Sequence, residues 1–185
     1  MKKDILTEIN VYHTVLSPQR GYNIDNKKIK AEAVKGYVLS AKRMEEKDCW
    51  EYKDYKFISP CTELSFLDTA IKDEFFAATK KSLKLKNRWV NIYEHLEQSY
   101  SRNSLYLNSY AESPWYTCIY CCDVVKDSSE LIIEYDDVTK INKLNKYKIE
   151  NNKLFIFPST LRYFFSENFS EDPNIFITHT YDLNI

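Results

Sequence analysis

The second half of the chain alternates between short strand-forming runs and polar breaks, and this pattern restricts the possible folds most. From residue 87 onwards, runs rich in Val, Ile, Leu, Tyr and Phe recur at roughly ten-residue spacing, separated by turn-forming residues. So many closely spaced strands are typical of a sandwich, a jelly roll or a barrel. The expected strands are 87–96, 103–110, 115–125, 130–135, 144–149, 153–158, 161–166 and 174–182.

The first half of the chain predicts two helices. Asp25 can cap a helix that runs to Met44, because apolar residues recur there at spacings of three and four. Thr62 can cap a second helix that runs to Leu83. The apolar stripe of this second helix indicates a face buried in the core, and it consists of Leu64, Leu67, Ile71, Phe75 and Ala78. Extended segments are expected at 5–16 and 52–58.

Two helices followed by a block of strands predict an α+β protein. Helices that precede such a block pack on one face of a sheet. We therefore expect a double-stranded β-helix core of jelly-roll or cupin type, with the two N-terminal helices packed on one sheet. No repeat or low-complexity linker interrupts the sequence, so a single domain is expected over 1–185, with the strand and helices in 1–86 and the β-helix core in 87–185.

Charge and composition argue against several classes of function. The chain has 26 basic and 27 acidic residues, and its net charge of −1 gives no support for a nucleic-acid partner. It has only 2 glycines and no glycine-rich phosphate-binding loop. No apolar run reaches membrane-spanning length and no signal segment follows Met1, so we expect no membrane partner and no secretion. The 5 cysteines are irregularly spaced, which favours free thiols in a reducing compartment.

Several motifs follow one another in a definite order through the strand-rich part. A helix leads into Trp89-Val90-Asn91, two strands follow at 115–125 and 129–135, and the corner Phe157-Pro158-Ser159 precedes a last strand after Pro173. Together these motifs resemble the Fe(II)/2-oxoglutarate-dependent dioxygenase family, and in particular its prolyl-hydroxylase-like members in phages. The resemblance implies the double-stranded β-helix fold, with Fe(II) and 2-oxoglutarate as the cofactors of active members.

The resemblance also indicates where this family holds its cofactors. Two histidines and a carboxylate bind the iron, and an arginine pairs with the distal carboxylate of 2-oxoglutarate. Carried onto this chain, the first histidine and the carboxylate fall at Tyr110 and Glu112, the second histidine at Tyr163 and the arginine at Asn174. Only the carboxylate is kept. The resemblance therefore implies a protein that kept the fold and lost the iron chemistry, with no cofactor.

A rearranged iron site is the alternative. The chain has 3 histidines, and two of them, His95 and His179, could combine with Glu112 or Asp123 to form two imidazoles and a carboxylate. This alternative predicts an active Fe(II)/2-oxoglutarate-dependent hydroxylase. A lone histidine on a strand is nevertheless more often structural than a metal ligand.

The sequence Cys118-x-x-Cys121-Cys122 suggests a zinc site at first sight. On a strand, however, Cys118 and Cys122 point to one face and Cys121 to the other, so the three sulfurs cannot converge on one ion. We predict buried free thiols instead.

We predict a non-catalytic protein of dioxygenase fold that acts by protein–protein binding. Richness in Lys, Asn, Ile and Tyr with few glycines is typical of an AT-rich phage or low-GC bacterial gene. The expected role is a phage virion protein of the neck, tail or head-completion type, or an accessory protein, located in the virion or the host cytoplasm. Its expected partner is another protein or a second copy, bound by outward-facing tyrosines. A third hypothesis is a small-molecule sensor that kept the barrel pocket.

Overall fold

A computed structural model describes residues 9–47, 58–104, 113–136 and 141–184, with residues 40–47 described by their backbone alone. In chain order the elements are β1 (Tyr12–Val15), the 3-10 turn η1 (Pro18–Arg20), α1 (Asn26–Lys47), α2 (Thr62–Thr79), β2 (Ser82–Tyr93), β3 (Tyr116–Asp123), β4 (Glu130–Tyr135), β5 (Lys143–Lys148), β6 (Lys153–Pro158), β7 (Arg162–Phe165) and β8 (Asn174–Asn184).

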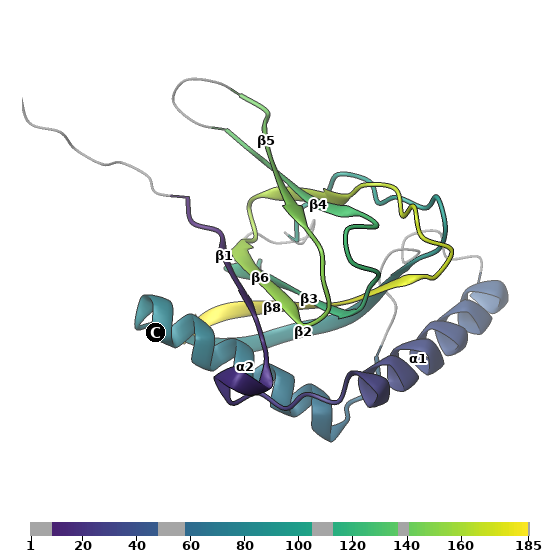
Figure 1. Ribbon diagram of the computed structural model, residues 1–185, viewed down its shortest axis with the longest axis horizontal. Coiled ribbons are helices and arrows are strands. Elements are labelled where there is room, and N and C mark those ends of the chain that lie inside the picture. The colour runs from purple at the N-terminus through teal and green to yellow at the C-terminus, as the bar shows by residue number, and fades with distance from the viewer. Residues whose placement is uncertain (1–8, 48–57, 105–112, 137–140, 185) are drawn as a thin grey trace, which may run out of the picture.

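The strands form two sheets that face each other. The larger sheet has the order β1-β6-β3-β8-β2 and the smaller one the order β5-β4-β7, and every strand pair among the described residues is antiparallel. Both helices cover the outer face of the larger sheet, while β4 and β5 lie on its opposite side (Figure 1). The fold is α+β with a double-stranded β-helix core, which confirms the predicted fold class.

The alternation of side chains on β8 shows how the core is divided into two layers. Ile175, Ile177 and Tyr181 belong to the apolar layer between the larger sheet and the helices. Phe176 belongs to the layer between the two sheets, which we call the barrel interior. Successive strand residues point to opposite faces, so β8 supplies both layers. This explains why the strand is buried from Asn174 to Tyr181.

The first helix confirms its predicted start. The Asp25 carboxylate accepts a hydrogen bond of 3.1 Å from the backbone N–H of Lys27, as expected of a capping residue. The helix continues to Lys47, which is slightly beyond the predicted end at Met44.

The second helix ends earlier than predicted. Its apolar stripe is buried as expected at Leu64, Leu67, Ile71 and Phe75, whereas Ala78 is exposed. The helix ends at Thr79 because Lys80 adopts a left-handed backbone, with φ of 61°, and its N–H bonds to the Phe76 carbonyl at 2.8 Å. The predicted end at Leu83 is wrong, because that residue already belongs to β2. The capping position is Cys61, and the predicted cap, Thr62, is the first helical residue.

Most predicted strands are present. The predictions for 130–135 and 153–158 match β4 and β6 residue for residue, and the strand predicted over 87–96 begins five residues earlier, at Ser82. Of the extended segment predicted over 5–16, only Tyr12–Val15 is a strand among the described residues. The predicted strands 52–58 and 103–110 fall mainly outside the described residues. No helix in the described parts of the chain is long and apolar enough to cross a membrane.

Candidate functional site in the barrel interior

Tyr163 lies inside the barrel on β7, at the position where the resemblance expects an iron-binding histidine. It sits opposite Ile133 of β4 and is 1% exposed. Its ring meets the Phe157 ring edge-on, with the centroids 5.4 Å apart, and the Arg102 guanidinium lies 5.8 Å from its centroid. Main-chain hydrogen bonds of 2.7 and 3.0 Å join Tyr163 to Arg102. The phenol is therefore held in place as part of the core.

Asn174 occupies the position where the resemblance expects the arginine. It is the first residue of β8 and is fully buried. Its side-chain oxygen accepts a hydrogen bond of 3.0 Å from the Val125 N–H, and its NH₂ group donates one of 2.9 Å to the Ser128 hydroxyl. The Asn174 amide thus holds the β3–β4 connection in place by hydrogen bonds. It carries no charge that could pair with a dicarboxylate.

Replacing Asn174 with alanine is expected to destabilise the protein by about 1–3 kcal/mol, because the Val125 N–H and the Ser128 hydroxyl would lose a buried partner. Urea unfolding at neutral pH measures the change. Asn184→Ala is the matched control, because Asn184 is exposed at the end of the same strand and its loss should cost less than about 0.5 kcal/mol. Equal stability of the two variants would contradict a fastening role for Asn174.

Aromatic rings fill much of the barrel interior around these two positions. Phe165 and Phe176 stack with their centroids 4.0 Å apart, and Tyr93 lies beside both. Each ring except that of Tyr93 is at most 1% exposed, and the buried set is Phe155, Phe157, Tyr163, Phe165 and Phe176. Close-packed rings of this kind form a hydrophobic core.

Two buried polar pairs line the same interior. The Thr117 and Ser159 hydroxyls are 2.9 Å apart, and the Thr178 hydroxyl donates to the Asn91 side chain at 3.0 Å. The pairs join residues 42 and 87 positions apart in the chain. Sequence reasoning missed them, because no local pattern signals a pairing over such a separation. They satisfy polar groups that would otherwise be costly to bury.

The residues of the alternative iron site lie in different places. His95 is exposed in the loop after β2, where its Nδ1 lies 3.0 Å from the Ser170 carbonyl oxygen. Asp123 forms an ion pair of 2.5 Å with Lys30 of α1. Glu112, like Tyr110, lies outside the described residues.

His179 lies on the helix-facing side of the larger sheet, in line with Ile177 and Tyr181. It is fully buried, and its Nε2 accepts a hydrogen bond of 2.7 Å from Arg88 Nε. The His95 loop follows Tyr93, which pairs with Asn174, five positions from His179 along β8. Five strand residues span about 17 Å, so the structure does not bring the two histidines together.

The described residues do not fit the iron and 2-oxoglutarate that the resemblance implies. Iron of this class takes imidazole and carboxylate ligands. Among the described residues, no Asp or Glu is buried, and the one buried histidine, His179, faces the helices. Within that same part of the chain, no three His, Cys, Asp or Glu side chains lie together so that they could hold a metal ion. Where the resemblance expects an iron-binding histidine and an arginine, the chain has the packed phenol of Tyr163 and the hydrogen-bonded amide of Asn174.

The three clustered cysteines are buried free thiols, as predicted. Cys118 and Cys122 lie in the layer under the helices, whereas Cys121 lies in the barrel interior. Burial raises the pKa of all three thiols, that of Cys122 to about 12. At neutral pH the three thiols are therefore protonated and are poor nucleophiles.

Comparison with known proteins places the chain among proteins of one fold. No protein-family model matches the sequence, and no curated protein matches it. Among solved structures, a prolyl-4-hydroxylase from Pseudomonas putida matches with a TM-score of 0.56 and 6% identity, over 93% of this chain and 91% of the other. The α-ketoglutarate-dependent epimerase SnoN of nogalamycin biosynthesis matches with a TM-score of 0.58 and 11% identity, over 93% and 76%.

A third match is a prolyl hydroxylase from Trichoplax adhaerens, solved with a peptide of hypoxia-inducible factor. Its TM-score is 0.51 at 13% identity, over 66% of this chain and 57% of the other, so the match spans little more than half of that enzyme. The chain therefore has the fold of the 2-oxoglutarate and Fe(II)-dependent oxygenases. At these identities the similarity establishes the fold, and the activity has to be argued from the site.

Proposed function

We propose that this chain is a non-catalytic protein of dioxygenase fold that acts by binding another protein. The observation that supports this most is the buried Tyr163, packed between Phe157 and Arg102 where the resemblance expects an iron-binding imidazole. A phenol binds Fe(II) poorly, because it must first lose a proton whose ordinary pKa is about 10. Asn174 stands where the resemblance expects the arginine that would pair with 2-oxoglutarate, and its amide carries no positive charge.

Exposed apolar side chains support the binding part of the proposal. Tyr100, Phe169 and Trp115 are 84%, 68% and 55% exposed. Aromatic side chains suit protein interfaces, because they bury a large area and lose few rotamers on binding. We propose a phage virion component of the neck, tail or head-completion type, or an accessory protein, in the virion or the host cytoplasm. Composition and the phage members of the resembled family support this finer role.

Anaerobic titration with Fe(II) and 2-oxoglutarate tests the loss of iron chemistry. Chelation of 2-oxoglutarate to Fe(II) in a protein site produces a metal-to-ligand charge-transfer absorption band. We expect no such band from this chain at high protein and metal concentrations, because Tyr163 and Asn174 replace the imidazole and the guanidinium. SnoN, a named α-ketoglutarate-dependent enzyme, is the positive control.

The second candidate function is a 2-oxoglutarate-dependent hydroxylase with rearranged ligands, which the names of the solved neighbours favour. A one-to-one charge-transfer band would overturn the non-catalytic proposal. Its loss in Glu112→Ala or His179→Ala would identify a ligand of the rearranged site. Retention in Cys61→Ser, a half-buried cysteine outside the proposed ligand set, would show that the loss is specific.

A further inference from the structure

The outer edge of β1 is an open sheet edge. Among the described residues, β1 is the terminal strand of the larger sheet and pairs with β6 alone. The Leu16 N–H donates a hydrogen bond of 2.9 Å to the Asn152 carbonyl. Hydrogen-bonded pairs alternate along an antiparallel pair of strands, so the main-chain groups of Leu16, Thr14 and Tyr12 face β6. The main-chain N–H and C=O groups of His13 and Val15 therefore point to the other edge. No further strand lies there among the described residues.

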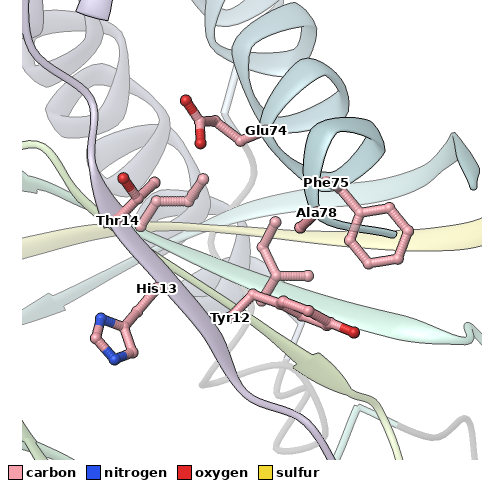
Figure 2. Close-up of a pocket in the computed structure, with 8 residues that line it drawn as sticks. Tyr12, His13, Thr14, Glu74, Phe75 and Ala78 are labelled. Carbon is pink, nitrogen blue, oxygen red and sulfur yellow. The ribbon is translucent and has the colours of Figure 1, made fainter. Parts of the chain in front are cut away.

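A pocket of about 140 Å³ adjoins this edge on the side that faces α2. Tyr12 and Thr14 form one wall, Phe75 and Ala78 of α2 the other, and Leu154 and Ile156 of β6 the floor. In Figure 2, Tyr12 points toward Phe75, whereas His13 points away from α2. The Tyr12 and Phe75 rings meet edge-on with centroids 5.7 Å apart. The pocket thus opens beside the strand, and Tyr12, His13 and Thr14 of β1 all take part in its lining.

Two polar groups at the rim of the pocket, those of Glu74 and Thr14, already have partners. The Glu74 carboxylate accepts a hydrogen bond of 2.9 Å from Arg20, and Arg20 also donates to the Thr14 hydroxyl. Glu74 is thus paired with Arg20, and apart from His13 the remaining lining is mainly apolar: Phe75, Ala78, Leu154, Ile156 and the Tyr12 ring. An apolar cavity of about 150 Å³ holds a benzene-sized group, so this one suits a single aliphatic side chain.

We propose that β1 binds an extended segment of a protein partner, which adds a strand to the sheet. The segment's main chain would pair with His13 and Val15, and one of its aliphatic side chains would enter the pocket. An open edge selects another strand because only a peptide backbone offers donors and acceptors at the same spacing, and pockets for alternate side chains give such sites their specificity. The inference rests on the proposed protein-binding function and names its partner as an extended, aliphatic segment.

A defined peptide tests the proposal. The probe is acetyl-Lys-Thr-Thr-Leu-Thr-Thr-Lys-amide, which has a strong strand preference and one aliphatic side chain. We expect saturable changes in the amide chemical shifts of His13 and Val15 on titration. A peptide with Asp in place of Leu should bind at least about tenfold more weakly, because the pocket would then enclose a charge. Absence of saturable shifts at millimolar concentrations of the leucine peptide would overturn the proposal.

Two variants of α2 distinguish peptide binding in the pocket from nonspecific peptide binding. Ala78→Phe should fill the pocket and weaken the leucine peptide at least about tenfold, whereas Ala77→Phe places the same ring one position away, outside the pocket lining. Both alanines are exposed, so both variants should fold. Equal peptide affinity in the two variants would overturn the pocket assignment.

A main-chain variant tests the hydrogen-bonding edge. His13→Pro removes one outward-pointing N–H and leaves the ladder to β6 intact, because edge strands tolerate proline. It should weaken the peptide, and wild-type affinity in this variant would contradict strand addition. Shifts at His13 and Val15 that depend on protein concentration alone would make a second copy the occupant and would overturn the partner as stated. The iron titration is independent: a charge-transfer band would overturn the non-catalytic function without affecting peptide binding.

Discussion

Replacing Phe176 with alanine is expected to lower the free energy of unfolding by about 3–5 kcal/mol. Phe176 is fully buried between the two sheets and stacks on Phe165 with the ring centroids 4.0 Å apart. Its removal would leave a cavity that neighbours on regular strands cannot close. Urea unfolding followed by tryptophan fluorescence measures the loss, with Phe169→Ala as the matched control.

Phe169 is 68% exposed, so its truncation should change stability by less than about 0.5 kcal/mol. The comparison bears on function as well as on packing. A barrel that holds a ligand keeps side chains around an open space, and their truncation costs less stability because the space already exists. Similar stabilities of Phe176→Ala and Phe169→Ala would contradict a filled barrel and would favour the sensor hypothesis of an open pocket.

The positions of most strands along the chain could be predicted because their signal is local. Alternating apolar residues between turn-forming residues located β4 and β6 to the residue. The same alternation correctly separated Cys121 from Cys118 and Cys122. The end of α2 was predicted wrongly, because a left-handed turn at Lys80 interrupts an apolar pattern that continues through Leu83 into β2. Boundaries of this kind depend on one backbone angle, which residue spacing does not reveal.

The site was less accessible to sequence reasoning, because its contacts join distant segments. Tyr163 and Asn174 were singled out from the resemblance. Only the structure shows that Tyr163 bonds to Arg102 and that Asn174 bonds to Val125. The pairing of Arg88 with His179, residues 91 positions apart, was not foreseen. The β1 pocket depends on how α2 packs over an edge strand, and no pattern within either segment signals that contact.

Acidification from pH 6.5 to pH 5 is expected to destabilise the protein by up to about 1.7 kcal/mol through His179 alone. Burial lowers the pKa of His179 well below its ordinary value of 6.5, and the nearby charges of Arg88 and Lys72 lower it further. Because Arg88 Nε donates to His179 Nε2, the imidazole is neutral in the folded state. The Asp68 carboxylate does little to stabilise a protonated His179, because it already binds Lys72 and the Tyr181 hydroxyl.

The sign of this effect follows from which state binds the proton. Below pH 6.5 the unfolded chain protonates His179 and the folded chain does not, so stability falls by up to about 1.4 kcal/mol per pH unit until the lower folded pKa is reached. Urea unfolding at several pH values between 5 and 6.5 measures the slope. His179→Gln keeps an oxygen that can accept from Arg88 and cannot titrate, so its slope should be smaller by one proton. A wild-type slope in His179→Gln would show that His179 is not the group that titrates.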